Sequence, residues 1–292
     1  MSIITFNKST IDRNDFITNT QPYQIVPLHD RFFYKDYLLT LPKCNNSNIL
    51  IHVSFTTRPF SSKQYNLTYS NVHGYELIAD QLGTKYILFH GPSNPDEYNN
   101  YLNGLEFIDK CMHNKKVCIE IPAFSSALRK LITNYYVFID EYLNTVIQFN
   151  NEYRNNQFQI VIDTAHLHAN GLDGKEMVKL LCKYKDHYDF IHLNGNIKDK
   201  FNPDVHTPID SINDKITDSW YVLEQVVKLN KICVCETKDG DYEYYDDISN
   251  EYGYRIVDRN KSYTYWYVLI YNNDLYNYLF SWNWCINYWF IM

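Results

Sequence analysis

Short apolar runs alternate with longer amphipathic stretches along most of the chain. The apolar runs lie at residues 2–6, 23–28, 48–55, 85–91, 116–122, 158–165, 189–195 and 231–238. Stretches with helical spacing of apolar positions fall between them, at residues 72–83, 95–113, 132–153, 174–185 and 217–230. Near-continuous apolar strands that alternate with amphipathic helices indicate a parallel sheet covered by helices.

The number of strands favours a closed form of that α/β arrangement. Eight strand candidates within about 240 residues predict a (β/α)8 TIM barrel, for which ~250 residues is typical. A doubly wound open sheet is the alternative, but no Gly-x-Gly-x-x-Gly follows a strand, so its dinucleotide-binding version lacks the fingerprint. We expect one barrel domain over residues 1–260. The aromatic C-terminal segment, 261–292, is either a final helix or a loosely constrained tail.

Composition and charge restrict the cellular compartment and the partners that we expect for the protein. The seven cysteines are scattered without a Cys-x-x-Cys pair, and the first fifteen residues lack the apolar stretch of a secretory signal. Residues 262–292 carry one charge, Asp274, but contain too much Asn and Tyr for a membrane span. We expect a monomer without a membrane partner in a reducing compartment, the cytoplasm or nucleus. The richness in Tyr, Asn and Ile is typical of viral and parasite chains from AT-rich genomes.

Residues able to bind a metal end six consecutive candidate strands. They are His52, His90, Glu120, Asp163, His192 and Glu236, and two loops add His166, Asp204 and His206. Taken singly, a histidine there is more often an ordinary polar residue, and an acid is commonly a helix cap. As a set they are informative, because side chains at the carboxyl ends of barrel strands converge on one mouth, where active sites lie.

Metal ions are the simplest partners for these carboxylates. Asp163 and Glu236 directly follow apolar runs, and burying an unpaired carboxylate costs several kcal/mol. Imidazole and carboxylate ligands without thiolate suit zinc or manganese. Nine ligands are too many for one ion and suit two or three. Each bound divalent ion would also add two positive charges to the net charge of −7, which by itself argues against a nucleic-acid partner.

The motifs that carry these residues resemble those of the endonuclease IV family of apurinic/apyrimidinic (AP) endonucleases. "IVIDTAHLHANGLD" is similar to the family's Asp-Thr-x-His segment, "FIHLNG" to its His-Leu-Asn-Asp and "PDVHTP" to its Asp-Arg-His. "LFHGPSN", "CIEIPAFSS" and "VCET" resemble its His-Pro-Gly-Ser-His, Glu-Asn-Thr-Ala-Gly and final Glu-Thr motifs. Order and rough spacing hold from about residue 48 to 238.

The resemblance implies a TIM barrel with three zinc ions that hydrolyses the phosphodiester 5′ to an abasic site in double-stranded DNA. It implies one zinc on His52, His90 and Glu120, and a second on Glu120, Asp163, His192 and Glu236. The third zinc is implied on His166, Asp204 and His206. Glu120 would bridge two ions and assist as a base. Phe55, Arg58 and Lys198 are candidates for DNA contact.

Three departures from the family motifs keep other functions open. Asn94, Gly195 and Val205 stand where the family has His, Asp and Arg, at positions that orient ligands or contact phosphate. A metal-dependent sugar isomerase or epimerase of the same barrel class is one alternative, and it would lack a full third metal site. A catalytically impaired relic that keeps its metals is the other.

Overall fold

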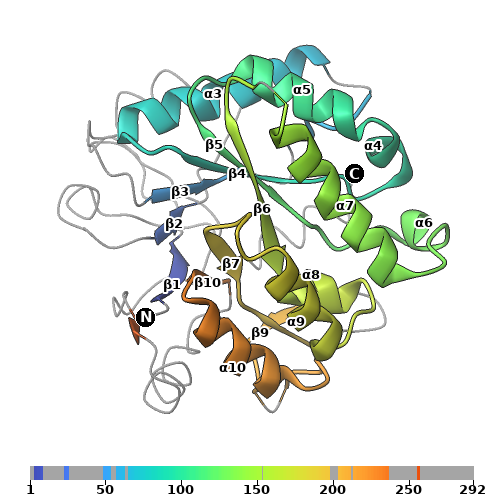
Figure 1. Cartoon of the computed structure of the whole chain (residues 1–292). Coiled ribbons are helices and arrows are strands. Elements are labelled where there is room, and N and C mark those ends of the chain that lie inside the picture. Colours follow the sequence, from blue (N-terminus) through green and yellow to red (C-terminus); the bar gives the residue numbers. More distant parts are fainter. Residues whose placement is uncertain are drawn as a thin grey trace, which may run out of the picture.

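Parallel strands close into a ring in the computed structural model. The structure describes residues 3–8, 23–25, 49–53, 57–62, 65–152, 154–197, 203–211, 213–236 and 255–256. The ring is formed by β1 (Ile3–Lys8), β2 (Tyr23–Ile25), β3 (Ile49–His52), β4 (Tyr86–His90), β5 (Lys116–Glu120), β6 (Gln157–Asp163), β7 (Phe190–His192) and β10 (Ile232–Cys235). Each strand pairs with its predecessor in that list, and β10 pairs with β1 from Ile3↔Ile232 to Phe6↔Cys235, which closes the barrel. The predicted TIM barrel is confirmed (Figure 1).

Two further pairings flank the ring. β11 (Arg255–Ile256) runs parallel to β1. β8 (Gly195–Asn196) and β9 (His206–Thr207) form a short antiparallel ribbon that follows β7. The ribbon brings His206 back toward the mouth of the barrel.

Alternation along each strand separates the inside of the barrel from the outside. One small cluster of buried apolar side chains comes from the strands alone: Leu50, Leu88, Cys118, Val161, Phe190 and Val234. The neighbouring strand residues instead join the large cluster beneath the helices. Because successive side chains point to opposite faces, the residue two positions further along also faces inward. Those residues are the six predicted strand-end ligands, His52, His90, Glu120, Asp163, His192 and Glu236.

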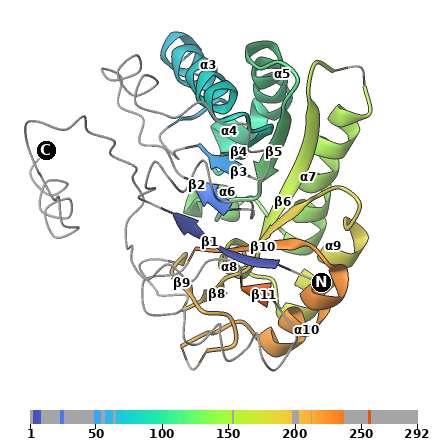
Figure 2. The ribbon, with the colours of Figure 1, turned by 90° about the vertical axis from the view of Figure 1, so that its left-hand side faces the viewer.

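Helices cover the outside of the barrel, and Figure 2 shows α3, α5 and α7 running alongside its strands. Their bounds are α3 Tyr65–Leu82, α4 Pro95–Asn99, α5 Tyr101–Cys111, α6 Ser126–Arg129, α7 Tyr135–Asn150, α8 Thr164–Ala169, α9 Gly174–Lys183 and α10 Ser219–Leu229. None of the helices in the described ranges combines the length and apolarity needed to cross a bilayer.

The single helix predicted over 95–113 is wrong: the segment forms two helices, α4 and α5. The break is at Asn100, whose side-chain Nδ2 donates to the carbonyl of Phe60 at 3.0 Å. This tertiary bond turns the chain beside the barrel mouth. The predicted DNA contacts Phe55 and Lys198, and the C-terminal segment 261–292, lie outside the described residues.

Candidate metal centre

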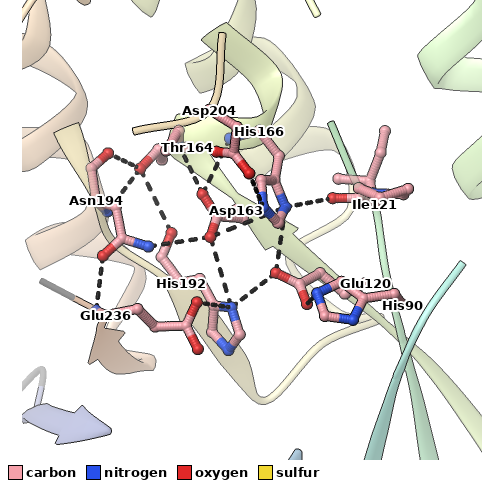
Figure 3. A network of polar contacts seen from close by, with 12 residues as sticks. His90, Glu120, Ile121, Asp163, Thr164, His166, His192, Asn194, Asp204 and Glu236 are labelled. Atoms are coloured by element: carbon pink, nitrogen blue, oxygen red, sulfur yellow. Dashed lines mark hydrogen bonds and ion pairs between the residues drawn. The ribbon is translucent and has the colours of Figure 1, made fainter. Parts of the chain in front are cut away.

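The structure brings the nine predicted ligand residues together at the carboxyl ends of the strands. Figure 3 labels His90, Glu120, Asp163, His166, His192, Asp204 and Glu236 among them. Glu120 lies at the centre and is fully buried. Its Oε2 is 3.3 Å from both His52 Nε2 and His90 Nε2, and its Oε1 is 3.3 Å from His166 Nδ1 and 2.8 Å from His192 Nδ1. One carboxylate therefore contacts four imidazoles from four elements of the chain.

Two compact groups of metal-capable atoms stand out within this cluster. In the first, His52, Glu120, His192 and Glu236 each offer a ligand atom, and these atoms lie within 4.8 Å of one another. In the second, Asp163, His166 and His206 do the same. His90 borders the first group through Glu120.

Asp204 extends the second group from the loop before β9. Its carboxylate lies between two imidazoles, with Oδ2 3.3 Å from His166 Nε2 and Oδ1 3.2 Å from His206 Nε2. His206 Nε2 also lies 3.9 Å from Asp163 Oδ2. The two groups differ from the partition into three zinc sites that the family resemblance implies, because His52 lies with His192 and Glu236. The number of ions stays a prediction.

Three of the imidazoles are oriented by the backbone. The Nδ1 of His52 bonds the Val53 carbonyl at 3.0 Å, and that of His166 bonds the Ile121 carbonyl at 2.9 Å. His206 Nδ1 bonds the carbonyl of Glu236 at 3.3 Å. A carbonyl only accepts, so each Nδ1 carries the hydrogen and each Nε2 is the ligand atom that faces the cluster. This is the usual arrangement of histidines that bind metals.

A divalent cation suits two buried ligand atoms of the cluster. Among the described residues, the buried atoms His52 Nε2 and Glu120 Oε2 have no hydrogen-bond partner, although they lie 3.3 Å apart. Leaving such groups unsatisfied costs about 1–3 kcal/mol each. Two ligands at ~2.0–2.1 Å from a tetrahedral zinc ion lie roughly 3.3 Å apart, so one ion would satisfy both atoms. The buried clusters of His, Glu and Asp thus have the composition and spacing of a metal centre.

The imidazoles differ in pKa. Burial lowers the pKa of His90 to about 3, despite the opposing effect of Glu120. Burial also disfavours the charged form of His206, but Asp163 and Asp204 outweigh it and raise the pKa of His206 to about 9. Without cations, the second group therefore holds a proton that metal binding would displace.

The central carboxylates are ionised despite their burial. Burial alone raises the pKa of Glu120, but His192 and His90 outweigh it and hold that pKa well below its usual value. Burial likewise raises the pKa of Asp163, and the opposing effect of His166 and His206 leaves it lowered. Both carboxylates are thus available as ligands at neutral pH.

Buried amide side chains hold the ligands, and the sequence analysis did not identify them. Gln24 on β2 contacts both Glu236 and His192. Asn194 donates its Nδ2 to Asp163 Oδ2 at 3.0 Å and accepts the backbone N–H of Glu236 at 2.7 Å. Asn194 lies two residues after a predicted ligand, which is a signal in the sequence. Gln24 has no such neighbour.

Asn196 fixes the loop that carries Asp204. Its Nδ2 donates to the carbonyls of Ala165 and Pro203, at 3.0 and 2.8 Å, and its Oδ1 accepts the N–H of Val205 at 3.1 Å. The amide thereby ties the loop to α8, which carries His166. Val205, one of the three departures from the family motifs, takes part through its backbone.

The other two departures have local structural roles. Asn94 caps α4, and its Oδ1 accepts the N–H of Glu97 at 3.1 Å. At Gly195, a Cβ atom would lie 2.7 Å from both Asp214 Cγ and the Pro208 carbonyl oxygen. The family's aspartate does not fit at this position without a shift of the ribbon.

A cavity of about 190 Å³ opens beside His90, His166 and Asp204. Thr57, Arg58 and further residues form its other walls. The Thr57 hydroxyl is buried and has no hydrogen-bond partner among the described residues. The side chain of Arg58, which the sequence analysis names as a candidate for DNA contact, is about half exposed.

Glu97 positions the Arg58 guanidinium at this cavity. Its Oε1 lies 3.8 Å from Arg58 Nη1, while its Oε2 accepts the backbone N–H of Ser93 at 2.9 Å and the Ser93 hydroxyl at 3.0 Å. The cavity thus has the cluster on one side and the Arg58 guanidinium and the Thr57 hydroxyl on the other.

Comparisons with known proteins define the class of fold. No family model and no curated protein matches the sequence. Among solved structures, the chain is similar to endonuclease IV from Thermus thermophilus, with a TM-score of 0.57 and 14% identity over 86% of this chain and 97% of that one. It is similar to a D-tagatose 3-epimerase-like protein, with a TM-score of 0.55, 14% identity and the same coverage.

These likenesses and the closed parallel sheet define the fold as a TIM barrel. At 14% identity they establish the fold alone.

Proposed function

We propose that the protein is a zinc-dependent AP endonuclease, which acts as a monomer on double-stranded DNA and hydrolyses the phosphodiester 5′ to an abasic site. The second group of metal-capable residues, completed by Asp204, is the observation that carries this proposal. It supplies ligands beyond those that His52, Glu120, His192 and Glu236 already offer. A multinuclear centre suits an anionic diester, whose charge must be neutralised as a nucleophile approaches.

Zinc ions bound by these groups would supply Lewis-acid charge and would lower the pKa of water toward ~7. The chain's own residues hold and orient the substrate. Glu120 joins the two groups, so a phosphate at the mouth meets both. Arg58, with Glu97 behind it, offers N–H donors to a flanking phosphate.

The cavity beside the cluster has room for a small group only. Its volume of about 190 Å³ is below the ~300–1,000 Å³ of drug-sized ligand sites. A nucleotide without its base also loses little stacking when it leaves the duplex. The small stacking cost favours a substrate with a missing base, whereas the size of the cavity suits a deoxyribose phosphate and a free sugar alike.

A metal-dependent sugar epimerase is the second candidate. The first group by itself has two carboxylates and two imidazoles, enough for one ion beside a free sugar. The likeness to the D-tagatose 3-epimerase-like protein is nearly as close as that to endonuclease IV. Such an enzyme would have no use for Asp204 and its two imidazoles.

The test uses zinc-loaded protein, a labelled duplex with one tetrahydrofuran abasic analogue, and a panel of ketohexoses. We expect a single cut 5′ to the analogue, prevented by prior removal of metal with a chelator. Asp204→Asn should abolish the cut, whereas the matched variant Asp186→Asn, on an exposed loop, should cut normally.

Epimerisation of a ketohexose without DNA cleavage would assign the second function. A fully zinc-loaded protein that acts on neither substrate would be a metal-binding relic, and the proposal would be wrong.

A further inference from the structure

Gln24 lies inside the barrel on β2 and touches two candidate ligands at once. Its side chain is fully buried. Its Nε2 donates to Glu236 Oε1 at 2.6 Å, and its Oε1 lies 2.9 Å from His192 Nε2. The two partners are 212 and 168 residues away along the chain, directly after β10 and at the end of β7.

The chemistry of these contacts fixes the orientation of the amide. A carboxylate only accepts hydrogen bonds, so the amide nitrogen must face Glu236. The amide oxygen then faces His192 Nε2, which must carry the hydrogen and donate it. His192 Nδ1 is left to face the cluster, 2.8 Å from Glu120 Oε1, 3.4 Å from Glu236 Oε2 and 3.6 Å from Asp163 Oδ2.

His192 differs in this respect from three other imidazoles of the cluster. Those of His52, His166 and His206 are oriented by backbone carbonyls and present Nε2 to the cluster. His192 is oriented by a side chain and presents Nδ1. A substitution can therefore remove the group that orients His192 without moving the backbone.

We propose that Gln24 is a positioning residue of the metal centre: it keeps the hydrogen of His192 on Nε2, so that Nδ1 binds metal, and holds Glu236 beside it. The inference rests on the metal-binding part of the proposed function and not on its substrate. Groups that orient ligands typically contribute 10–100-fold to metal affinity.

Gln24→Met is the informative variant, because it keeps the length of the side chain and removes both hydrogen bonds. Gln159→Met is its matched control. Gln159 is also largely buried in the barrel, but its Nε2 donates to Asp189 Oδ2 at 3.0 Å, away from the nine candidate ligands. Competition with a chromophoric chelator measures zinc affinity, and thermal melts of the metal-free proteins measure the structural cost.

We expect Gln24→Met to weaken the binding of at least one zinc ion by about 10–100-fold, and Gln159→Met to leave all zinc affinities unchanged. A merely structural role would lower the melting temperatures of both metal-free variants and spare zinc affinity in both. Wild-type zinc affinity in Gln24→Met would overturn the proposal.

A second measurement needs no variant. Two-bond ¹H–¹⁵N spectra of the zinc-loaded wild-type protein report which nitrogen of each histidine carries hydrogen. We expect His192 protonated at Nε2 and bound to metal through Nδ1, and the opposite assignment would overturn the proposal. Because neither measurement uses DNA, a protein that binds zinc but cuts nothing would refute the endonuclease and leave the role of Gln24 intact.

Discussion

Asp163 combines two roles that substitutions can separate. Its Oδ1 caps α8, where it accepts the N–H groups of Ala165 at 2.7 Å and His166 at 3.1 Å. Its Oδ2 accepts from Asn194 Nδ2 at 3.0 Å and faces the candidate metal ligands. Asparagine caps helices as well as aspartate does, whereas alanine does not. Asp163→Asn therefore removes the ligand and keeps the cap, and Asp163→Ala removes both.

The loss of unfolding free energy in each variant follows from the hydrogen bonds that it removes. In Asp163→Asn, an amide NH₂ replaces Oδ2 and leaves the buried Asn194 donor without its acceptor, which costs about 1–3 kcal/mol. Asp163→Ala leaves the same donor unsatisfied and also loses the cap, for about 1 kcal/mol more. Both variants should lose metal from the second group, because neither an amide nor a methyl group replaces a carboxylate ligand.

Urea unfolding of the metal-free proteins, followed by circular dichroism, measures stability, and elemental analysis measures zinc content. Asp173 provides the control, since it caps α9 by accepting the N–H of Glu176 at 2.9 Å, on the exposed outside of the barrel. Asp173→Ala should cost about 1 kcal/mol and retain all zinc. Equal stability of Asp163→Ala and Asp163→Asn, or wild-type zinc content in either variant, would contradict the two roles of Asp163.

Three further predictions address charge, substrate contact and packing. The pKa of His206 is raised from 6.5 to about 9, so its contribution to the stability of the metal-free protein is complete below pH 6.5 and lost as the pH rises through 9. Urea unfolding of the metal-free protein across that range should show a loss of stability to which His206 contributes about 3 kcal/mol, and the zinc-loaded protein should not show it. Arg58→Ala should raise KM for the abasic duplex with kcat unchanged and reduce the slope of log affinity against log salt by about 1, while Arg58→Lys keeps that slope. An unaltered slope in Arg58→Ala would remove Arg58 from the DNA contact. Gly195→Ala should cost about 1–3 kcal/mol in urea unfolding, because its Cβ would crowd Asp214 and Pro208, and wild-type stability would contradict that packing.

Much of the fold and of the site could be predicted because one regularity encodes both. In each strand that carries a candidate ligand, an apolar residue such as Leu88 or Val161 faces into the barrel, and the ligand follows two positions later. This alternation requires no knowledge of distant contacts. The same rule brings the strand ends to one mouth.

What the sequence left open depends on tertiary contacts. The break between α4 and α5 rests on a bond from Asn100 to Phe60, forty residues earlier in the chain. Gln24 looks like any residue of a short buried strand, because its partners follow 212 and 168 residues later in the chain. The grouping of the ligands depends on how each imidazole turns about its own bonds, and no spacing along the chain encodes that.

Anomalous scattering at the zinc absorption edge, from crystals of the zinc-loaded protein, tests most directly whether these side chains form one metal centre. The proposed metal centre predicts three peaks per chain, with one bound by both His52 Nε2 and Glu120 Oε2 and another by the imidazoles of His166 and His206 together with Asp204. A single peak, or peaks away from these atoms, would contradict it.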